Sequence, residues 1–170
     1  MIQATSFWAV RGNQLHCLGE TQGHPDTETL AEYIKRTYKD KKHPISVYPD
    51  PTGKARKSSA PVGRTDFSIL ESYGFQVLAR KKSPPIVDSA AAVNKKLKTA
   101  GGEIDMFIDP KCMGVIKSLE RTSWVDKNPD SATIDKSDGV EHFSDGVRYG
   151  TEYLFPIHTG TKRVTRGFNF

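Results

Sequence analysis

The sequence predicts a single α/β domain in which helices flank a mixed β-sheet. Three observations carry this prediction. A chain of 170 residues suits one domain of ordinary size. Strand-like and helix-like segments alternate along most of it, as they do in α/β proteins. With 36% hydrophobic and 26% charged residues, the composition supports a packed core and is unlike that of disordered or collagen-like chains.

The first segments predict a hairpin, a helix and a strand. Residues 5–20 contain two strand-like runs around a turn that includes Gly12 and Asn13. A helix follows, with Asp26 or Thr27 as its N-cap. Its apolar residues recur at helical spacing, at Leu30, Ile34 and Tyr38. Residues 45–48 then form a short buried strand.

The middle of the chain continues the alternation. Residues 52–64 form a loop rich in small and basic residues. Asp66 caps a short helix that closes at Gly74, and residues 75–79 form the next strand. The clearest helical stripe follows, at Ile86, Ala90, Val93 and Leu97. Residues 104–108 are typical of an edge strand.

Two helices and a polar loop make up the C-terminal part. We expect helices over about residues 110–121 and 140–153. The apolar residues of the second helix that face the core are Phe143, Val147 and Leu154. Residues 125–139 lack an apolar period and predict a mobile loop. The basic tail at 158–170 is expected to be poorly ordered.

Charge and cysteine content narrow the class of protein. Twenty-five Lys and Arg against 20 Asp and Glu give a net charge of +5, which slightly favours a polyanionic partner. Cys17 and Cys112 are too few for a disulfide scaffold and indicate reduced thiols. No apolar run approaches the roughly 18 residues that a membrane-spanning helix needs. We therefore expect a soluble, intracellular protein without a membrane partner.

Several familiar motifs are absent. Thr52-Gly53-Lys54-Ala55 looks like part of a phosphate-binding loop, but Tyr48 and Ala55 stand where that motif needs Gly and Ser or Thr. The acidic residues of the 125–139 loop lack the spacing of a calcium-binding EF-hand. No zinc-ligand spacing or nucleophile motif occurs. The sequence therefore lacks the motifs of ATPases with a phosphate-binding loop, of EF-hand calcium proteins and of hydrolases with a nucleophile motif.

Asp50 is the first candidate metal ligand. It follows the predicted strand at 45–48 and lies between Pro49 and Pro51. In open α/β sheets, functional sites gather at the carboxyl ends of strands, so a carboxylate there is well placed for a metal ion. The alternative is that Asp50 simply forms the turn.

His142 and Asp145 are the second candidate. At a spacing of three residues they lie on the same side of the last predicted helix. A carboxylate in the first turn also benefits from the positive end of the helix dipole. The alternative is a solvated helix start, for which Asp138 and Glu141 would serve equally well.

Basic residues are concentrated after two predicted strands. One group follows Asp50, and the other follows the strand at 75–79; together they are Lys54, Arg56, Lys57, Arg64, Arg80, Lys81 and Lys82. If the two strands are parallel neighbours, both groups lie at the same sheet edge as Asp50. A carboxylate metal site surrounded by cations suits a phosphodiester backbone. The alternative is that each group belongs to a solvated loop.

Five sequence blocks, taken in order, carry a resemblance to a known family. They are residues 47–56 (VYPDPTGKAR), 66–74 (DFSILESYG), 108–112 (IDPKC), 116–120 (IKSLE) and 141–149 (EHFSDGVRY). Together they resemble the C-terminal nuclease domain of the large terminase subunit of tailed bacteriophages. The resemblance covers residues 1–157, nearly the whole chain.

This resemblance implies a ribonuclease-H-like (RuvC-like) fold and a metal-dependent endonuclease that cuts concatemeric viral DNA during packaging into the procapsid. It implies two divalent ions, Mg²⁺ or Mn²⁺, with Asp50 and Asp145 as ligands and His142 ligating or orienting a ligand. The implied partners are double-stranded DNA, the terminase ATPase domain, the small terminase subunit and the portal. The implied location is the cytoplasm of the host bacterium.

One departure from the family pattern concerns the first catalytic acid. In the family this acid ends a central first strand, whereas here no Asp or Glu precedes Glu20. We expect the first strand and its acid to lie upstream of Met1, in which case this chain would bind metal weakly and cleave poorly. Acids that could substitute are Glu20, Asp66, Asp109 and Glu141.

Two other functions remain compatible with the sequence. The first is a docking module of the packaging motor that grips DNA or the portal with little cleavage. The second is another ribonuclease-H-like nuclease, such as a Holliday-junction resolvase. The block around Asp50 favours the terminase over the resolvase.

Overall fold

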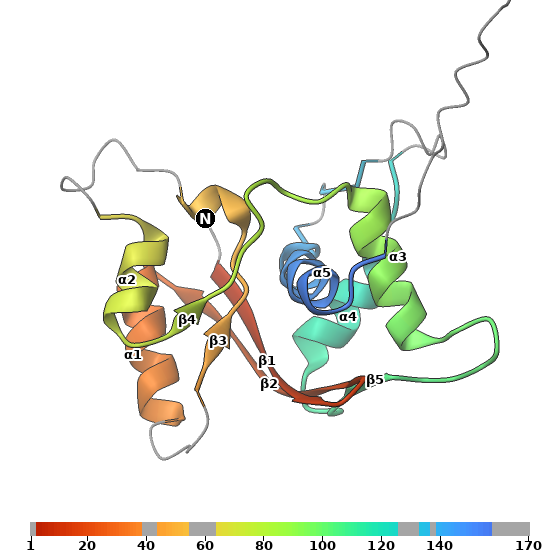
Figure 1. Ribbon diagram of the computed structural model, residues 1–170, viewed down its shortest axis with the longest axis horizontal. Coiled ribbons are helices and arrows are strands. Elements are labelled where there is room, and N and C mark those ends of the chain that lie inside the picture. Colours follow the sequence, from red (N-terminus) through yellow and green to blue (C-terminus); the bar gives the residue numbers. More distant parts are fainter. Residues whose placement is uncertain (1–2, 39–43, 55–63, 126–132, 137–138, 158–170) are drawn as a thin grey trace, which may run out of the picture.

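A three-stranded sheet forms the centre of the protein (Figure 1). The computed structural model describes residues 3–38, 44–54, 64–125, 133–136 and 139–157. The sheet order is β1-β2-β5, with bounds β1 Gln3–Arg11, β2 Gln14–His24 and β5 Met106–Ile108. β1 and β2 are antiparallel, whereas β5 is parallel to β2. The predicted mixed sheet and the predicted edge strand are therefore confirmed.

The two remaining strands form a sheet of their own. β3 (Ser46–Val47) and β4 (Gln76–Val77) pair in parallel. The sequence predicted one sheet, and this expectation is wrong for the described strands. The physical reason is that β1 and β5 already pair with the two edges of β2, and β3 pairs with β4 alone. The parallel pairing does confirm that both strands end in the same direction.

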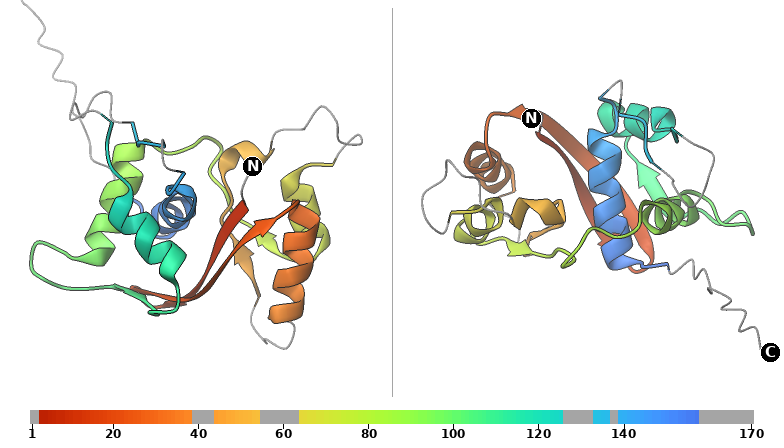
Figure 2. Two further views of the ribbon diagram at one scale, coloured as in Figure 1. Left: turned by 180° about the vertical axis from the view of Figure 1, so that it is seen from behind. Right: turned by 90° about the horizontal axis from the view of Figure 1, so that it is seen from above.

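Helices lie in two groups, one on each side of the β1–β2 hairpin (Figures 1 and 2). The first group packs with the small sheet and comprises α1 (Thr27–Thr37), the 3₁₀ helix η1 (Pro51–Lys54) and α2 (Asp66–Ser72). The second group comprises α3 (Ile86–Leu97), α4 (Met113–Arg121) and α5 (His142–Leu154). α5 packs against β1, α3 and α4, which places it next to the central sheet.

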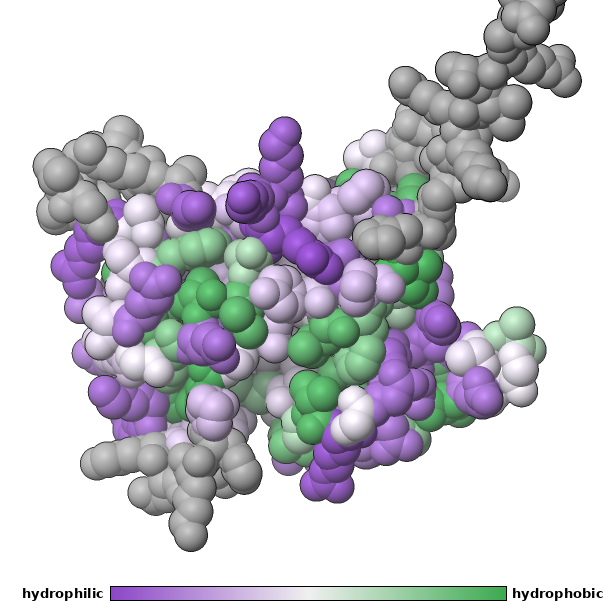
Figure 3. All heavy atoms as spheres, in the orientation of Figure 1, coloured by the Kyte–Doolittle hydropathy of each residue, from purple (hydrophilic) through white to green (hydrophobic). Residues whose placement is uncertain are grey.

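Each group of helices has its own hydrophobic core. The larger core lies under α3–α5 and consists of Leu15, Cys17, Val93, Met106, Cys112, Val115, Phe143 and Val147. The smaller core lies between α1, α2 and β4 and consists of Leu30, Ala31, Ile34, Leu70 and Phe75. Phe7 packs on the smaller core and its neighbour Trp8 on the larger, because successive strand residues point to opposite faces. Apolar residues on both sides of the β1–β2 hairpin reach the surface on the face shown in Figure 3.

The helix caps agree with the sequence in one case and differ in another. Asp26 caps α1, since its Oδ1 accepts a hydrogen bond of 2.8 Å from the Thr29 N–H. Thr65, and not Asp66, caps α2: its hydroxyl accepts from the Ser68 N–H, and the Ser68 hydroxyl accepts from the Thr65 N–H. Asp66 instead accepts a hydrogen bond from the Thr27 hydroxyl and so ties α2 to α1.

Part of the polar loop at 125–139 is described, namely residues 125, 133–136 and 139. Ile134 is buried and forms an isolated antiparallel bridge with Trp124. The expectation of a mobile loop is therefore wrong at Ile134, because its apolar side chain is packed in the interior. The tail at 158–170 and the basic residues Arg56 and Lys57 lie outside the described residues. Among the helices that the structure describes, none is long and apolar enough to cross a membrane.

Candidate metal and nucleic-acid site

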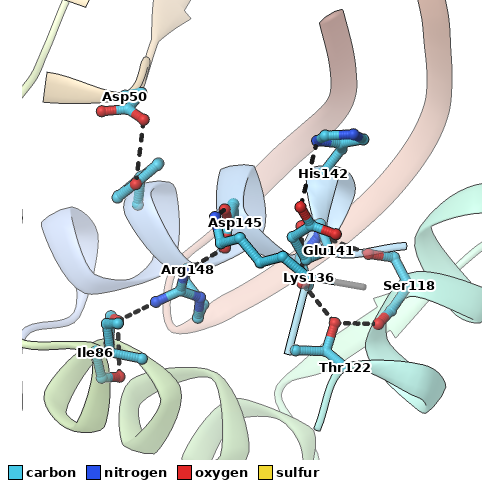
Figure 4. Close-up of polar contacts among 12 residues, drawn as sticks. Asp50, Ile86, Ser118, Thr122, Lys136, Glu141, His142, Asp145 and Arg148 are labelled. Carbon is cyan, nitrogen blue, oxygen red and sulfur yellow. Dashed lines mark hydrogen bonds and ion pairs between the residues drawn. The ribbon is translucent and has the colours of Figure 1, made fainter. Parts of the chain in front are cut away.

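Asp50 forms a turn and also faces α5. Its Oδ1 accepts hydrogen bonds from the N–H and the hydroxyl of Thr52, at 2.8 and 2.9 Å. This is the turn-forming role that the sequence left open as an alternative. Its other oxygen, Oδ2, accepts a hydrogen bond of 3.3 Å from the hydroxyl of Tyr149 on α5. The carboxylate thus reaches from the end of the small sheet to the last helix (Figure 4).

Asp145 lies in the first turn of α5 between two cationic side chains (Figure 4). Arg148 donates a hydrogen bond from Nη2 to Asp145 Oδ1. Lys136 approaches the other oxygen, with Nζ 3.0 Å from Oδ2. The Asp145 side chain keeps 18% of its surface exposed. The Asp145 carboxylate is therefore already paired with positively charged groups of the protein.

Tyr149 bonds to one candidate acid and follows the other on the same helix. It lies one turn after Asp145 on α5, and its hydroxyl bonds to Asp50. Burial, followed by the negative charges of Asp50 and Asp145, raises the pKa of Tyr149 to about 12. The hydroxyl is therefore protonated at neutral pH and remains a hydrogen-bond donor to Asp50.

The start of α5 is fixed by hydrogen bonds to α4 (Figure 4). The Ser118 hydroxyl donates to the carbonyl of Val140 and accepts from the Ser144 N–H at 2.8 Å. The hydroxyls of Thr122 and Ser144 are 2.7 Å apart. These contacts hold the first turn of α5, and with it Asp145, against a neighbouring helix.

His142 lies beside a buried acid. Its Nδ1 is 3.9 Å from Glu141 Oε1, which is too long for a hydrogen bond. Glu141 is buried, and its Oε2 has no hydrogen-bond partner among the described residues. A buried carboxylate oxygen without a partner is costly, and a bound cation would offset that cost.

The other acids named as substitutes have different roles. Glu20 accepts hydrogen bonds from the N–H groups of Gly114 and Val115, at 2.8 and 2.7 Å, and so caps α4. Asp66 is bound by Thr27, as described above. Asp109 accepts from the Lys111 N–H and pairs with its ammonium group at 3.2 Å. Of the four, Glu141 alone is on the segment that carries Asp145.

Several carboxylate oxygens of this region are of the type that a hard divalent cation binds, but among the described residues they do not form a group that could hold one. Carboxylate oxygens are the ligands that Mg²⁺ and Mn²⁺ prefer. Asp50 Oδ2, Asp145 Oδ2 and the unpartnered Oε2 of Glu141 offer such oxygens. In the part of the chain that the structure describes, no three or more His, Cys, Asp or Glu side chains are grouped closely enough to hold a metal ion.

The predicted basic residues differ in their surroundings. Arg64 pairs with Glu28 at 2.7 Å, which directs it toward α1. Arg80 pairs with the buried Glu152 at 3.0 Å and lies 5.0 Å from the centre of the Tyr153 ring. The exposed lysines of the set are Lys54, Lys81 and Lys82. Arg80 is thus a structural tie to α5, whereas the lysines are open to solvent.

Three further side chains of this region were not named as site residues from the sequence, although two of them carry a signal there. Tyr149 was visible one turn after Asp145, but its bond to Asp50 spans 99 positions. Arg148 shows the i,i+3 spacing to Asp145 that often indicates a helix ion pair. Lys136 belongs to the polar loop and gave no signal of its own.

Solved structures share this fold. The large terminase of a thermophilic bacteriophage, in complex with ATP-γ-S, superposes with a TM-score of 0.63 and 15% identity, over 90% of this chain and 37% of that chain. A further structure of that terminase gives 0.61 and 15%, over 89% and 36%. Its complex with ADP gives 0.60 and 17%, over 90% and 37%.

These structural similarities establish the fold and show how much of this chain it covers. The structural neighbours are phage large terminases, and this chain spans about 37% of the length of the first of them. A scan against models of protein families finds no match, and neither does a search of curated proteins. The class that fold and site define is therefore an α/β protein with the architecture of part of a large terminase.

Proposed function

We propose that residues 1–157 are the nuclease domain of a bacteriophage large terminase, with a ribonuclease-H-like fold and a metal-dependent DNA-cutting site. The observation that carries the proposal is the hydrogen bond to Asp50 from Tyr149, which lies one turn after Asp145 on α5, in a fold shared with phage large terminases. A contact that joins the segments of two acids, with exposed lysines nearby in the sequence, suits a phosphodiester substrate.

Each side chain has a defined task in this proposal. Asp50 and Asp145 would hold Mg²⁺ or Mn²⁺, which supplies Lewis-acid stabilisation and lowers the pKa of bound water. Tyr149 holds Asp50 through its hydrogen bond, and Arg148 holds Asp145. His142, at the start of α5, orients a ligand or a water molecule next to Asp145. The buried Glu141 adds negative charge to the same helix end.

The lysines provide the binding of the DNA backbone. Lys54, Lys81 and Lys82 are exposed and follow the two parallel strands that end beside Asp50. Lys and Arg contacts to phosphates give affinity and position without reading the base sequence. Arg56 and Lys57 belong to the same proposed surface by sequence. The substrate is double-stranded viral DNA.

The partners follow from the same proposal. In phage packaging this chain would work with the terminase ATPase domain, the small terminase subunit and the portal of the procapsid, in the cytoplasm of the host bacterium. Two of the similar terminase structures carry a nucleotide. Nucleotide binding would belong to the ATPase domain, because this chain lacks a phosphate-binding loop.

A second candidate is a docking module that grips DNA or the portal without cutting. The observation in its favour is that both oxygens of Asp145 already contact cationic side chains. A module of this kind would bind DNA with a strong dependence on salt and leave it intact.

Plasmid nicking in Mn²⁺ tests the proposal. We expect slow conversion of supercoiled to nicked plasmid, because one acid of the family pattern is missing from this chain, and a fall to background in Asp145→Asn and in Asp50→Asn. Asp109→Asn is the control, because Asp109 is an exposed acid engaged with Lys111. Nicking that survives both substitutions would remove the two acids from the mechanism. DNA binding without cleavage in any metal would favour the docking module, and preference for branched over linear DNA would favour a resolvase.

A further inference from the structure

Two buried thiols lie in the larger core and have no part in the proposed function. Cys17 is on β2 and is 2% exposed, and Cys112 directly precedes α4 and is 0% exposed. Both thiols are free and belong to the same hydrophobic cluster. They are the two cysteines of the whole sequence, so a disulfide within one molecule has to join them.

Backbone hydrogen bonds bring these two residues together, although they are far apart in the sequence. Cys17 stands opposite Ile108 in the parallel pair of β2 and β5, and its carbonyl accepts a hydrogen bond of 3.2 Å from the Asp109 N–H. The chain then turns at once, because the Cys112 N–H donates to the Asp109 carbonyl at 2.8 Å. Two consecutive hydrogen bonds therefore connect the backbone of Cys17 to that of Cys112.

The side chains agree with this proximity. Burial, followed by the neighbouring Cys112 thiol, raises the pKa of Cys17 to about 12. The Cys17 thiol also donates a hydrogen bond of 3.6 Å to the Gly19 carbonyl, which gives its sulfur a defined position beside β2. Since the reactive form of cysteine is the thiolate, the closed fold protects Cys17 from oxidation.

Access to the pair depends on the turn before α4. Pro110 and Lys111 in this turn are exposed, whereas Cys112 next to them is buried. Exposed turns open locally at a lower free-energy cost than core strands do. Opening of this turn would expose the sulfurs to a dissolved oxidant.

We propose that Cys17 and Cys112 are a redox pair, which a small disulfide such as oxidised glutathione converts into a disulfide that joins β2 to the start of α4. This inference is independent of the proposed nuclease function. α4 also carries Ser118 and Thr122, whose hydroxyls hold the first turn of α5. The disulfide therefore adds a covalent constraint to the helix that supports that turn.

The reaction is a double thiol–disulfide exchange. One protein thiolate attacks a sulfur of oxidised glutathione and displaces one glutathione, which leaves a mixed disulfide on the protein. The second protein thiolate attacks the protein sulfur of that mixed disulfide and displaces the second glutathione. The two cysteine sulfurs lose two electrons in total, the two glutathione sulfurs gain them, and the two thiol protons pass to the released glutathiones.

Incubation of the full chain with oxidised glutathione tests whether the disulfide forms. At low protein concentration, we expect intact-mass spectrometry without reductant to show the loss of two hydrogen atoms, and proteolysis to yield a peptide that links Cys17 to Cys112. Bound glutathione in place of the link would show that the sulfurs do not meet. That result, or an unchanged mass at saturating oxidant, would overturn the proposal.

The glutathione equilibrium shows whether the fold itself favours the disulfide. A cross-link that stabilises the fold is favoured by the fold to the same extent, because the two equilibria are linked. At a fixed glutathione ratio, we expect the ratio of disulfide to dithiol to be about 30- to 1000-fold higher in buffer than in concentrated urea. An equal or lower ratio in buffer would overturn the proposal.

Thermal melting gives a readout with a matched control. The oxidised chain should melt about 5–15 °C above the reduced chain, because the link constrains the unfolded state. Cys112→Ala is the control, and the same oxidant should not raise its melting temperature. A similar rise in Cys112→Ala, or a lower melting temperature of the oxidised unmodified chain, would overturn the proposal. If Cys112→Ala does not fold, the mass and equilibrium measurements on the unmodified chain decide.

Discussion

The hydroxyl of Tyr149 donates a hydrogen bond of 3.3 Å to Asp50, across 99 positions of sequence. Asp50 follows the small sheet, and Tyr149 lies on the helix beside the large core. The contact therefore joins the two halves of the protein at the candidate site. Tyr48 and Tyr153 strengthen the same junction, with ring centres 5.4 Å apart.

Removing the Tyr149 hydroxyl should weaken the candidate metal site. Tyr149→Phe keeps the ring and deletes the donor to Asp50, so the carboxylate loses its orientation. We expect Mn²⁺ affinity, measured by calorimetry, to fall about two- to tenfold, the net size of an ordinary hydrogen bond, because this one is long and partly exposed. Tyr153→Phe is the control, because Tyr153 contributes its ring to the junction. Equal affinities in both variants would show that Tyr149 does not orient Asp50.

Gly114 should not tolerate a side chain. A Cβ at this position would lie 2.6 Å from Phe143 and 3.0 Å from Glu20 Oε1, and Glu20 caps α4 there. We expect Gly114→Ala to lower the free energy of unfolding in urea by about 1–3 kcal/mol, despite the higher helix propensity of Ala. Gly146, on α5, has no neighbour within 4 Å of such a Cβ. Gly146→Ala should therefore be neutral or stabilising by up to about 1 kcal/mol. A stabilised Gly114→Ala would contradict the packing described.

The cap of α1 should make stability depend on pH in acid. Hydrogen bonds from the Thr29 N–H, and then from its hydroxyl, lower the pKa of Asp26 below its usual 3.8. A lowered pKa in the folded state stabilises the protein above the unfolded value, and this contribution is lost as the pH falls through the folded value. We expect Asp26→Ala to melt at a lower temperature than the unmodified chain at neutral pH, and the two to converge in acid. A difference that is constant with pH would rule out the charged cap.

Lys81 and Lys82 should contribute to DNA binding without affecting the fold. Each lost phosphate contact should reduce the slope of log affinity against log salt by about one. We expect Lys81→Ala and Lys82→Ala to weaken DNA binding in this way, with unchanged melting temperatures. Arg80→Ala should lower the melting temperature as well, because it leaves the buried Glu152 without its partner. Unchanged salt slopes in the lysine variants would place the DNA elsewhere.

The predictions that succeeded depend on local patterns. The apolar repeat at Leu30 and Ile34 and the Asp26 cap are set by neighbours in sequence, and α1 forms there. The hairpin also follows from short strand-like runs. The parallel pairing of β3 and β4 was a condition that the sequence left open, and the structure meets it. The two helices of the C-terminal part begin two or three residues later than expected, where turns end.

The predictions that failed depend on contacts between distant segments. Thr65 and Asp66 are both acceptable caps by type, and only the position of Thr27 shows that Asp66 serves the neighbouring helix. Ile134 is a single apolar residue in a polar loop, so no period reveals its burial. The strand expected upstream of residue 1 stays a prediction.

The candidate site was predictable in part. Asp50 and Asp145 were selected as acids at the ends of elements; the structure bonds Asp50 to Tyr149, one turn after Asp145 on α5, and the role of both acids stays a prediction. The pairing of Asp145 with Lys136 could not be predicted, because it needs the position of a loop residue, whereas the i,i+3 spacing of Arg148 to Asp145 is visible in the sequence. The packing of α5 also decides which basic residues form ion pairs within the protein and which stay exposed to DNA. The sequence does not show that packing.

Anomalous diffraction from crystals soaked in Mn²⁺ tests the central claim most directly, since it locates the metal itself. The account predicts an anomalous peak at ligand distance from the carboxylates of Asp145 and Asp50. A peak elsewhere, for example at the exposed Asp109, or no peak at Asp50 and Asp145 would contradict it.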